Sequence, residues 1–219
     1  MNLYPLYNSL RIAAISSVFV FFLGIFFAYF VSKLPRLVKG IVDVILTLPL
    51  VLPPTVCGWL LLLVFGIKHP IGKFLLQFGI QFPMNWYGAI LASIVVSFPL
   101  MYRTVRASFE AFDEDLSDVG KTLGLSNTFI FWRIRIPYCK SGILAGIVLS
   151  FARALGEYGA TSMLTGYIPN KTATIATTVY HLWKSNNETL AFQWVCINVI
   201  ISFVILVIVN LLESKKVKK

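Results

Sequence analysis

Long runs of apolar residues, separated by short polar or charged stretches, dominate the chain. A helix needs about 20 apolar residues to cross the roughly 30 Å hydrocarbon core of a bilayer. Five runs approach or exceed this length, and we expect each to form a membrane-spanning helix. They cover residues 12–31, 44–65, 86–102, 141–164 and 190–212. The pattern therefore predicts an all-α integral membrane protein, with residues 1–219 forming one domain of five transmembrane helices.

The second run is interrupted by Pro49, Pro53 and Pro54. Each proline removes a backbone donor, and its ring disfavours a straight helix. In lipid, the carbonyls that lose their partners need neighbouring helices or a water-lined cavity. We therefore expect a kinked helix over residues 44–65, which either lines a polar passage or serves packing alone.

The fourth run contains two charged residues, Arg153 and Glu157. Side chains four residues apart share a helix face, so we expect them to pair. A lone charge near the bilayer centre costs about 2.5–3.5 kcal/mol on insertion scales, and pairing offsets part of this cost. A structural role as a latch or gate is favoured over direct contact with a substrate, and both interpretations stay open. The run also carries small residues suited to close packing against a helix of this chain or of a second copy: Gly142, Gly146, Ser150 and Gly156.

The longest polar segment, residues 103–140, carries six basic and five acidic side chains. Within it, apolar residues recur at helical spacing from Phe112 to Leu123, which predicts a short amphipathic helix. Three acidic residues, at positions 113–115, stand at the start of this helix, where the helix dipole favours negative charge. Gly124 is placed to end the helix. Acidic residues disfavour docking on an anionic membrane surface, so this helix is expected to dock on a protein.

The composition supports a membrane location. Hydrophobic residues make up 58% of the chain and charged residues 13%, against about 45–50% and about 25% in ordinary soluble domains. The sequence therefore excludes a soluble globule, a disordered chain, a collagen and a disulfide scaffold.

The net charge of +10 is distributed unevenly along the chain. Basic residues concentrate in cytoplasmic loops of membrane proteins. With the N-terminus outside, the cytoplasmic segments hold 13 of the 19 basic residues and the outer segments hold 5. The 13 are Lys33, Arg36, Lys39, Arg103, Arg106, Lys121, Arg133, Arg135, Lys140, Lys215, Lys216, Lys218 and Lys219. We therefore expect an outer N-terminus, a cytoplasmic C-terminus and no nucleic-acid partner. Residues 172–184 are too few to span the bilayer, and we expect a short helix there that lies at the outer interface or between the spans.

The chain offers no constellation for catalysis or metal binding. His69 and His181 fall in outer loops without a paired carboxylate or nucleophile, and the three cysteines show no CxxC spacing. Gly120-Lys121-Thr122 resembles the end of a phosphate-binding loop, but the glycine required five residues earlier is Asp115. We expect no catalytic residues, metal or cofactor. A membrane enzyme acting on lipid, or a pure scaffold, are the alternatives from other classes.

Within the long polar segment, Gly124 and the run at residues 134–137 resemble part of a known sequence signature. The EAA signature of ABC importer permeases reads E-A-A, three residues, Gly, nine residues, I-x-L-P. This spacing is kept here, with Gly124 at the glycine and substitutions at several other places. The matching positions are Asp118, Val119, Gly120, Gly124, Ile134, Ile136 and Pro137. The resemblance implies that this loop is a coupling loop that seats on a cytoplasmic ATPase subunit.

Two further stretches narrow the resemblance to molybdate and sulfate permeases. Residues 48–58 are similar to their L-P-L-V-L-P-P-x-V-x-G run, and residues 151–161 to their F-A-R-x-L-G-E-F-G-A-T run. The resemblance implies a bacterial plasma-membrane permease that imports molybdate, with tungstate and sulfate as alternatives. It also implies a homodimer, two ABC ATPase subunits, an extracytoplasmic oxyanion-binding protein, and no chemistry in this chain. The residues expected at the translocation path or gate are Pro53, Pro54, Arg153, Glu157 and Thr161.

Overall fold

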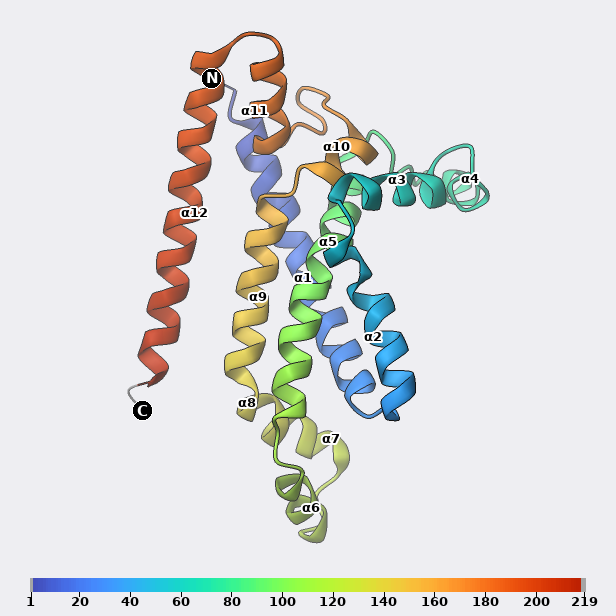
Figure 1. Cartoon of the computed structure of the whole chain (residues 1–219), viewed down its shortest axis with the longest axis vertical. Helices are drawn as coiled ribbons and strands as arrows, with labels where there is room; N and C mark the ends of the chain where they lie inside the picture. The colour runs from blue at the N-terminus through green and yellow to red at the C-terminus, as the bar shows by residue number, and fades with distance from the viewer. Residues whose placement is uncertain (1, 218–219) are drawn as a thin grey trace.

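The computed structural model describes the backbone of residues 2–217 and the side chains of residues 2–207. Over this range it is an all-helical bundle, as expected (Figure 1). Three helices are long and apolar enough to cross a membrane, namely α1 (Tyr4–Ser32), α5 (Trp86–Glu110) and α12 (Glu188–Val217). The count reaches five if each of two bent helix pairs forms one span.

The core of the bundle lies where α1, α5 and α9 (Lys140–Leu155) pack side by side. Tyr102 and Phe109 of α5 are almost fully buried there. Glycines allow the close approach, because a side chain at Gly146 would meet the Met101 sulfur at 2.7 Å, and one at Gly142 would collide with Ser108. The small-residue face predicted on the fourth run therefore packs at these two glycines against α5 of the same chain.

The second predicted span is not one kinked helix. Two residues separate α2 (Arg36–Val51) from α3 (Pro54–Phe65), and the two axes are bent by 112°. Leu52 and Pro53 are extended, with ψ of 140° and 135°. The prolines leave no donors to continue the helix, so the chain turns sideways. α3 has 12 residues, about 18 Å of helix, too short to span a bilayer. The expectation of a single helix over residues 44–65 was wrong.

The fourth predicted span is also broken. α9 ends at Leu155, and residues 156–158 connect it to the short helix α10 (Gly159–Thr165). At its other end α9 is bent by 70° from the preceding helical segment, residues 127–138. That segment comprises α7 (Asn127–Ile130), the π-helical turn η1 (Phe131–Arg135) and α8 (Ile136–Tyr138). A continuous helix over residues 141–164 was therefore incorrect.

The remaining elements follow the sequence pattern more closely. α1 and α5 are longer than the apolar runs 12–31 and 86–102, so α5 takes up the first part of the predicted loop 103–140. α11 (Ile175–Lys184) is the short helix expected within residues 172–184. The backbone of α12 covers the run 190–212. Four of the basic residues expected in the cytoplasm are not fully described: the side chains of Lys215 and Lys216, and the whole of Lys218 and Lys219, lie outside the described residues.

The two ends of the bundle are formed by different elements. α6 (Glu114–Thr122) and α7 extend beyond the long helices at one end, called here the α6 end (Figure 1). α10, α11 and the N-terminus lie at the other end, the α11 end, where α3 and α4 (Pro70–Gln77) project sideways (Figure 1). α12 lies along one flank and contacts mainly α11.

Candidate functional site

The predicted amphipathic helix of the long loop is α6. Asp113 caps it, because its carboxylate accepts a hydrogen bond from the Asp115 N–H at 3.0 Å. Glu114 and Asp115 occupy the first turn, where the helix dipole favours negative charge. Gly124 follows the last turn with φ of +79°, a conformation that favours glycine. The residues expected to start and stop this helix do so.

α6 presents an apolar row to its surroundings. Leu116, Val119 and Leu123 are 41%, 58% and 73% exposed, while Ser117 and Gly120 on the opposite face are buried. Phe112, the first residue of the predicted apolar face, is instead buried in the core. The exposed side of α6 is therefore more apolar than its charged sequence suggests.

The buried face of α6 is held by the chain that returns to the bundle. A side chain at Gly120 would lie 3.1 Å from Ile130 and 3.6 Å from Ile134, so glycine lets α6 lie close to α7 and η1. Ile134 and Ile136 are half-buried, whereas Pro137, Asp118 and Val119 are exposed. Of the matched signature positions, Gly120 and Ile134 therefore meet in space.

Arg135 fixes this arrangement and was missed as a site residue. It is 6% exposed, and one guanidinium nitrogen lies 2.6 Å from each carboxylate oxygen of Glu114. Its guanidinium also stacks on Phe112, 4.5 Å from the ring centroid. The contact joins the start of α6 to η1. On the exposed side, the hydrogen bond to Asp118 at 2.7 Å raises the pKa of Lys121.

A second cluster lies where the two broken helices meet. α3 and α10 pack against each other, and a side chain at Gly58 would lie 2.7 Å from the Ala160 carbonyl. A side chain at Gly159 would likewise meet Pro54 at 2.9 Å. The two proline- and glycine-rich stretches that resemble molybdate and sulfate permeases are therefore neighbours. We call this contact the α3–α10 junction.

The predicted pair of Arg153 and Glu157 forms at this junction. A guanidinium nitrogen of Arg153 lies 2.6 Å from Glu157 Oε2, an ion pair without an aligned hydrogen bond. Glu157 lies beyond the end of α9, so the pair crosses the helix break and does not follow one helix face. Its other oxygen accepts a hydrogen bond from the Ala160 N–H at 2.7 Å, near the start of α10. Glu157 is nearly fully buried, and the Arg153 side chain is 29% exposed.

The other residues expected at the path or gate are placed differently. Pro53 is exposed at the turn between α2 and α3, and Pro54 is half-buried. Thr161 is buried in α10 among packed helices, with its carbonyl accepting a hydrogen bond from Thr165. Of these three residues, Thr161 is enclosed by protein and Pro53 is the most exposed.

An ion-pair network at the α6 end was also missed in the sequence. Arg106 of α5 lies 2.5 Å from Asp43 of α2 and 3.6 Å from Glu110, and Lys39 lies 3.2 Å from Glu110. Arg106 and Glu110 are four residues apart on α5, whereas the pairs Arg106–Asp43 and Lys39–Glu110 join residues far apart in the sequence, which no local pattern could reveal. The network ties α2, the helix that leads into the sideways turn, to α5.

The chain is similar to known proteins over most of its length. Residues 20–218 match the family described as "Binding-protein-dependent transport system inner membrane component". A putative molybdenum transport system permease protein of Bacillus subtilis (strain 168), YvgM, is 38% identical over 204 residues, which cover 92% of this chain and 89% of the relative. The molybdenum transport system permease protein ModB of Escherichia coli (strain K12) is 40% identical over 190 residues, covering 86% and 83%.

A solved structure has the same fold. A bacterial ABC transporter that imports the acidic polysaccharide alginate superposes with a TM-score of 0.79 at 17% identity, covering 98% of this chain and 79% of the other. The family match spans nearly the whole chain, and the structure has the fold of an ABC transporter membrane subunit. This chain belongs to the family of binding-protein-dependent transport system inner membrane components and is a membrane-embedded permease of the ABC importer type.

Proposed function

We propose that this chain is the membrane subunit of an ATP-driven importer of molybdate. Two copies would form the translocation path, two ATPase subunits would hydrolyse ATP, and an extracytoplasmic oxyanion-binding protein would deliver the anion. The chain itself would carry out no chemistry and need no cofactor. The similarity to molybdenum permeases at 38–40% identity, over most of both chains, supports this substrate above tungstate and sulfate.

The observation that carries the proposal is the apolar row on α6. Leu116, Val119 and Leu123 are exposed on α6, and no described part of the chain covers them. Such a row on a short, rigidly held helix suits insertion into a groove of an ATPase. A lipid-modifying enzyme or a scaffold would have no need for this row together with the α3–α10 junction.

The rigid attachment of α6 suits the transmission of force. Arg135 joins α6 to η1, and η1 continues through α8 into α9. Arg153 lies in the last turn of α9, and its ion pair with Glu157 leads into α10 and the junction. Movement of α6 by ATPase closure would therefore reach the junction through α9. The junction is the proposed gate of an alternating-access mechanism.

The state of Glu157 supports a latch more than a substrate contact. One of its oxygens is paired with Arg153 and the other receives the Ala160 N–H. A carboxylate near the start of α10 would repel an oxyanion approaching the same place. In the proposed gate, Glu157 therefore holds Arg153 and α10 in place while the anion passes elsewhere.

The proposed orientation puts the α6 end in the cytoplasm of a bacterial cell, with the N-terminus outside and the C-terminus inside. The described basic side chains Lys33, Arg36 and Lys39 follow α1 toward the α6 end, which agrees with the excess of positive charge in cytoplasmic loops.

The proposal is tested by expressing this chain, with an ATPase and a binding protein from its own transporter, in a bacterium that lacks molybdate uptake. We expect restored accumulation of molybdenum at low external molybdate, and loss of this uptake with Leu123→Asp. Sulfate accumulation without molybdate accumulation would assign the chain to sulfate. No uptake of any oxyanion, with all subunits assembled, would refute the transport role.

A further inference from the structure

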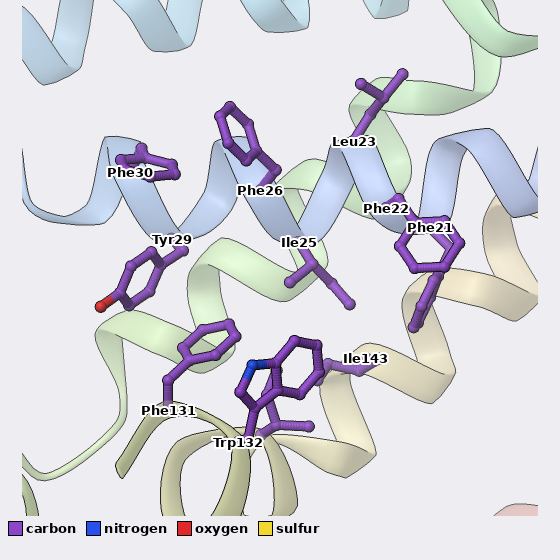
Figure 2. A pocket seen from close by; sticks show the side chains of 11 residues that line it. Phe21, Phe22, Leu23, Ile25, Phe26, Tyr29, Phe30, Phe131, Trp132 and Ile143 are labelled. Carbon is purple, nitrogen blue, oxygen red and sulfur yellow. The ribbon is translucent and has the colours of Figure 1, made fainter. Parts of the chain in front are cut away.

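An apolar groove follows α1 toward the α6 end. It has a volume of about 530 Å³ and is lined by Phe22, Ile25, Phe26 and Tyr29 of α1, with Phe131 and Trp132 of η1 opposite. Figure 2 shows Ile25 and Tyr29 pointing toward Phe131 and Trp132. We call this feature the aromatic groove. It opens to the surroundings, because Phe22, Phe26 and Trp132 are each more than half exposed.

A polar pocket of about 330 Å³ adjoins the aromatic groove. The two share Tyr29 and Phe131, so the apolar lining passes directly into the polar one. The charged side chains of this pocket are Lys33, Glu114, Lys121 and Arg135.

The polar pocket has one cation available for an anion. Arg135 is paired with Glu114 and Lys121 with Asp118. Lys33 is exposed and has no carboxylate partner among the described residues. Its ammonium group donates a hydrogen bond to the Tyr29 hydroxyl and lies 3.9 Å from the centroid of the Tyr29 ring. Lys33 is thus held at the junction of groove and pocket.

The length of the groove fits the bilayer. Its α1 lining runs from Phe21 to Phe30, which corresponds to about 14 Å along a helix. Half of a hydrocarbon core is about 15 Å thick. One acyl chain of one leaflet therefore matches the groove in length. Trp132 is exposed along this groove, where an indole can report on a bound chain.

We propose that the aromatic groove and the polar pocket together bind one anionic phospholipid, with an acyl chain along α1 and the headgroup phosphate at Lys33. An apolar groove that leads to a cationic side chain matches an amphiphile with an apolar chain and one anionic end. The bound lipid would brace η1 against α1 beside Arg135. The groove runs toward the α6 end, so we assign the lipid to the cytoplasmic leaflet; this assignment rests on the proposed function, whereas the lipid site itself does not.

The test uses the full chain in mixed micelles, with no ATPase or transport required. Lipids with brominated acyl chains quench tryptophan on contact, and subtraction of the Trp132→Phe signal isolates Trp132. Brominated phosphatidylglycerol is compared with brominated phosphatidylcholine in the wild type, in Lys33→Gln and in Arg36→Gln. Arg36 is the matched control, because it is an exposed cation at the start of α2 that lines neither cavity.

We expect phosphatidylglycerol to quench Trp132 at an about fivefold lower mole fraction than phosphatidylcholine, the preference that one lysine near a phosphate gives. Lys33→Gln should abolish this preference and Arg36→Gln should keep it. Equal quenching by both lipids, or an unchanged preference in Lys33→Gln, would overturn the proposal. Absence of quenching by either lipid would also overturn it, because no acyl chain would then reach Trp132. Loss of the preference on adding millimolar inorganic phosphate would assign Lys33 to free anions.

Discussion

Removing the charge of Glu157 tests the latch at the α3–α10 junction. Glu157→Gln keeps the size of the side chain and an oxygen that can accept the Ala160 N–H, whose bond is 2.7 Å long. It removes the negative charge that lies 2.6 Å from the Arg153 guanidinium. The substitution therefore separates the ion pair from the hydrogen bond at the start of α10.

The expected loss follows from the burial of the two side chains. Removing one partner of a fully buried ion pair costs about 3–5 kcal/mol, and an exposed pair contributes about 0–1 kcal/mol. The Glu157 side chain is 1% exposed and that of Arg153 is 29% exposed, so protein encloses the stranded guanidinium only in part. We expect a loss of about 2 kcal/mol in the free energy of unfolding, between these two limits. For a chain of this length this lowers the melting temperature by about 4–8 °C.

The assay is thermal unfolding of the purified chain in detergent, with Ser162→Ala on α10 as the control. The double variant Arg153→Gln with Glu157→Gln removes both charges, so it should recover most of the lost melting temperature. If the double variant melts no higher than Glu157→Gln alone, the two residues do not act as a latch. If it regains stability but the assembled transporter does not regain oxyanion uptake, Arg153 contacts the substrate and the preference for a latch is wrong.

Three further predictions concern other parts of the chain. Leu123→Asp, at a side chain that is 73% exposed, should abolish co-purification of the ATPase and leave the melting temperature of the chain unchanged; retained co-purification would contradict docking through α6. Gly146→Leu should destabilise the chain by about 1–3 kcal/mol, because it forces a side chain against Met101 at the α5–α9 contact, and an unchanged melting temperature would contradict that packing. A reporter active only in the cytoplasm should work when fused after Lys219 and fail when fused before Met1; the reverse result would refute the proposed orientation.

Much of the fold could be predicted from local patterns. The apolar runs located α1, α5 and α12, because a long apolar stretch has few alternatives to a membrane helix. Asp113 and Gly124 marked the two ends of α6 through capping chemistry that acts within one turn. The pairing of Arg153 with Glu157 followed from the cost of isolated charge in lipid.

The sharp turns could not be predicted from apolar content. Hydropathy does not distinguish one spanning helix from two short helices, so the sequence predicted one helix over residues 44–65 and another over residues 141–164. Pro53 and Pro54 indicated a disruption, but the 112° angle depends on how α3 packs against α10. That packing needs Gly58 opposite Ala160, a contact between residues about a hundred positions apart in the chain.

Long-range ion pairs were missed for the same reason. Arg135 and Glu114 are separated by 21 positions, and Arg106 reaches Asp43 on another helix. Each residue alone looks like an ordinary basic or acidic loop residue. The signal that could have drawn attention to Arg135 is its place between two apolar residues of the loop, Ile134 and Ile136.

The most direct test of the transport account is uptake by the assembled transporter in proteoliposomes. This chain, its ATPase and its binding protein are reconstituted, and accumulation of labelled molybdate is measured with ATP supplied on the ATPase side. The account predicts saturable uptake that requires ATP and the binding protein, and that a tenfold excess of sulfate leaves essentially unchanged. Uptake of sulfate in preference to molybdate, or accumulation of molybdate without ATP, would contradict it.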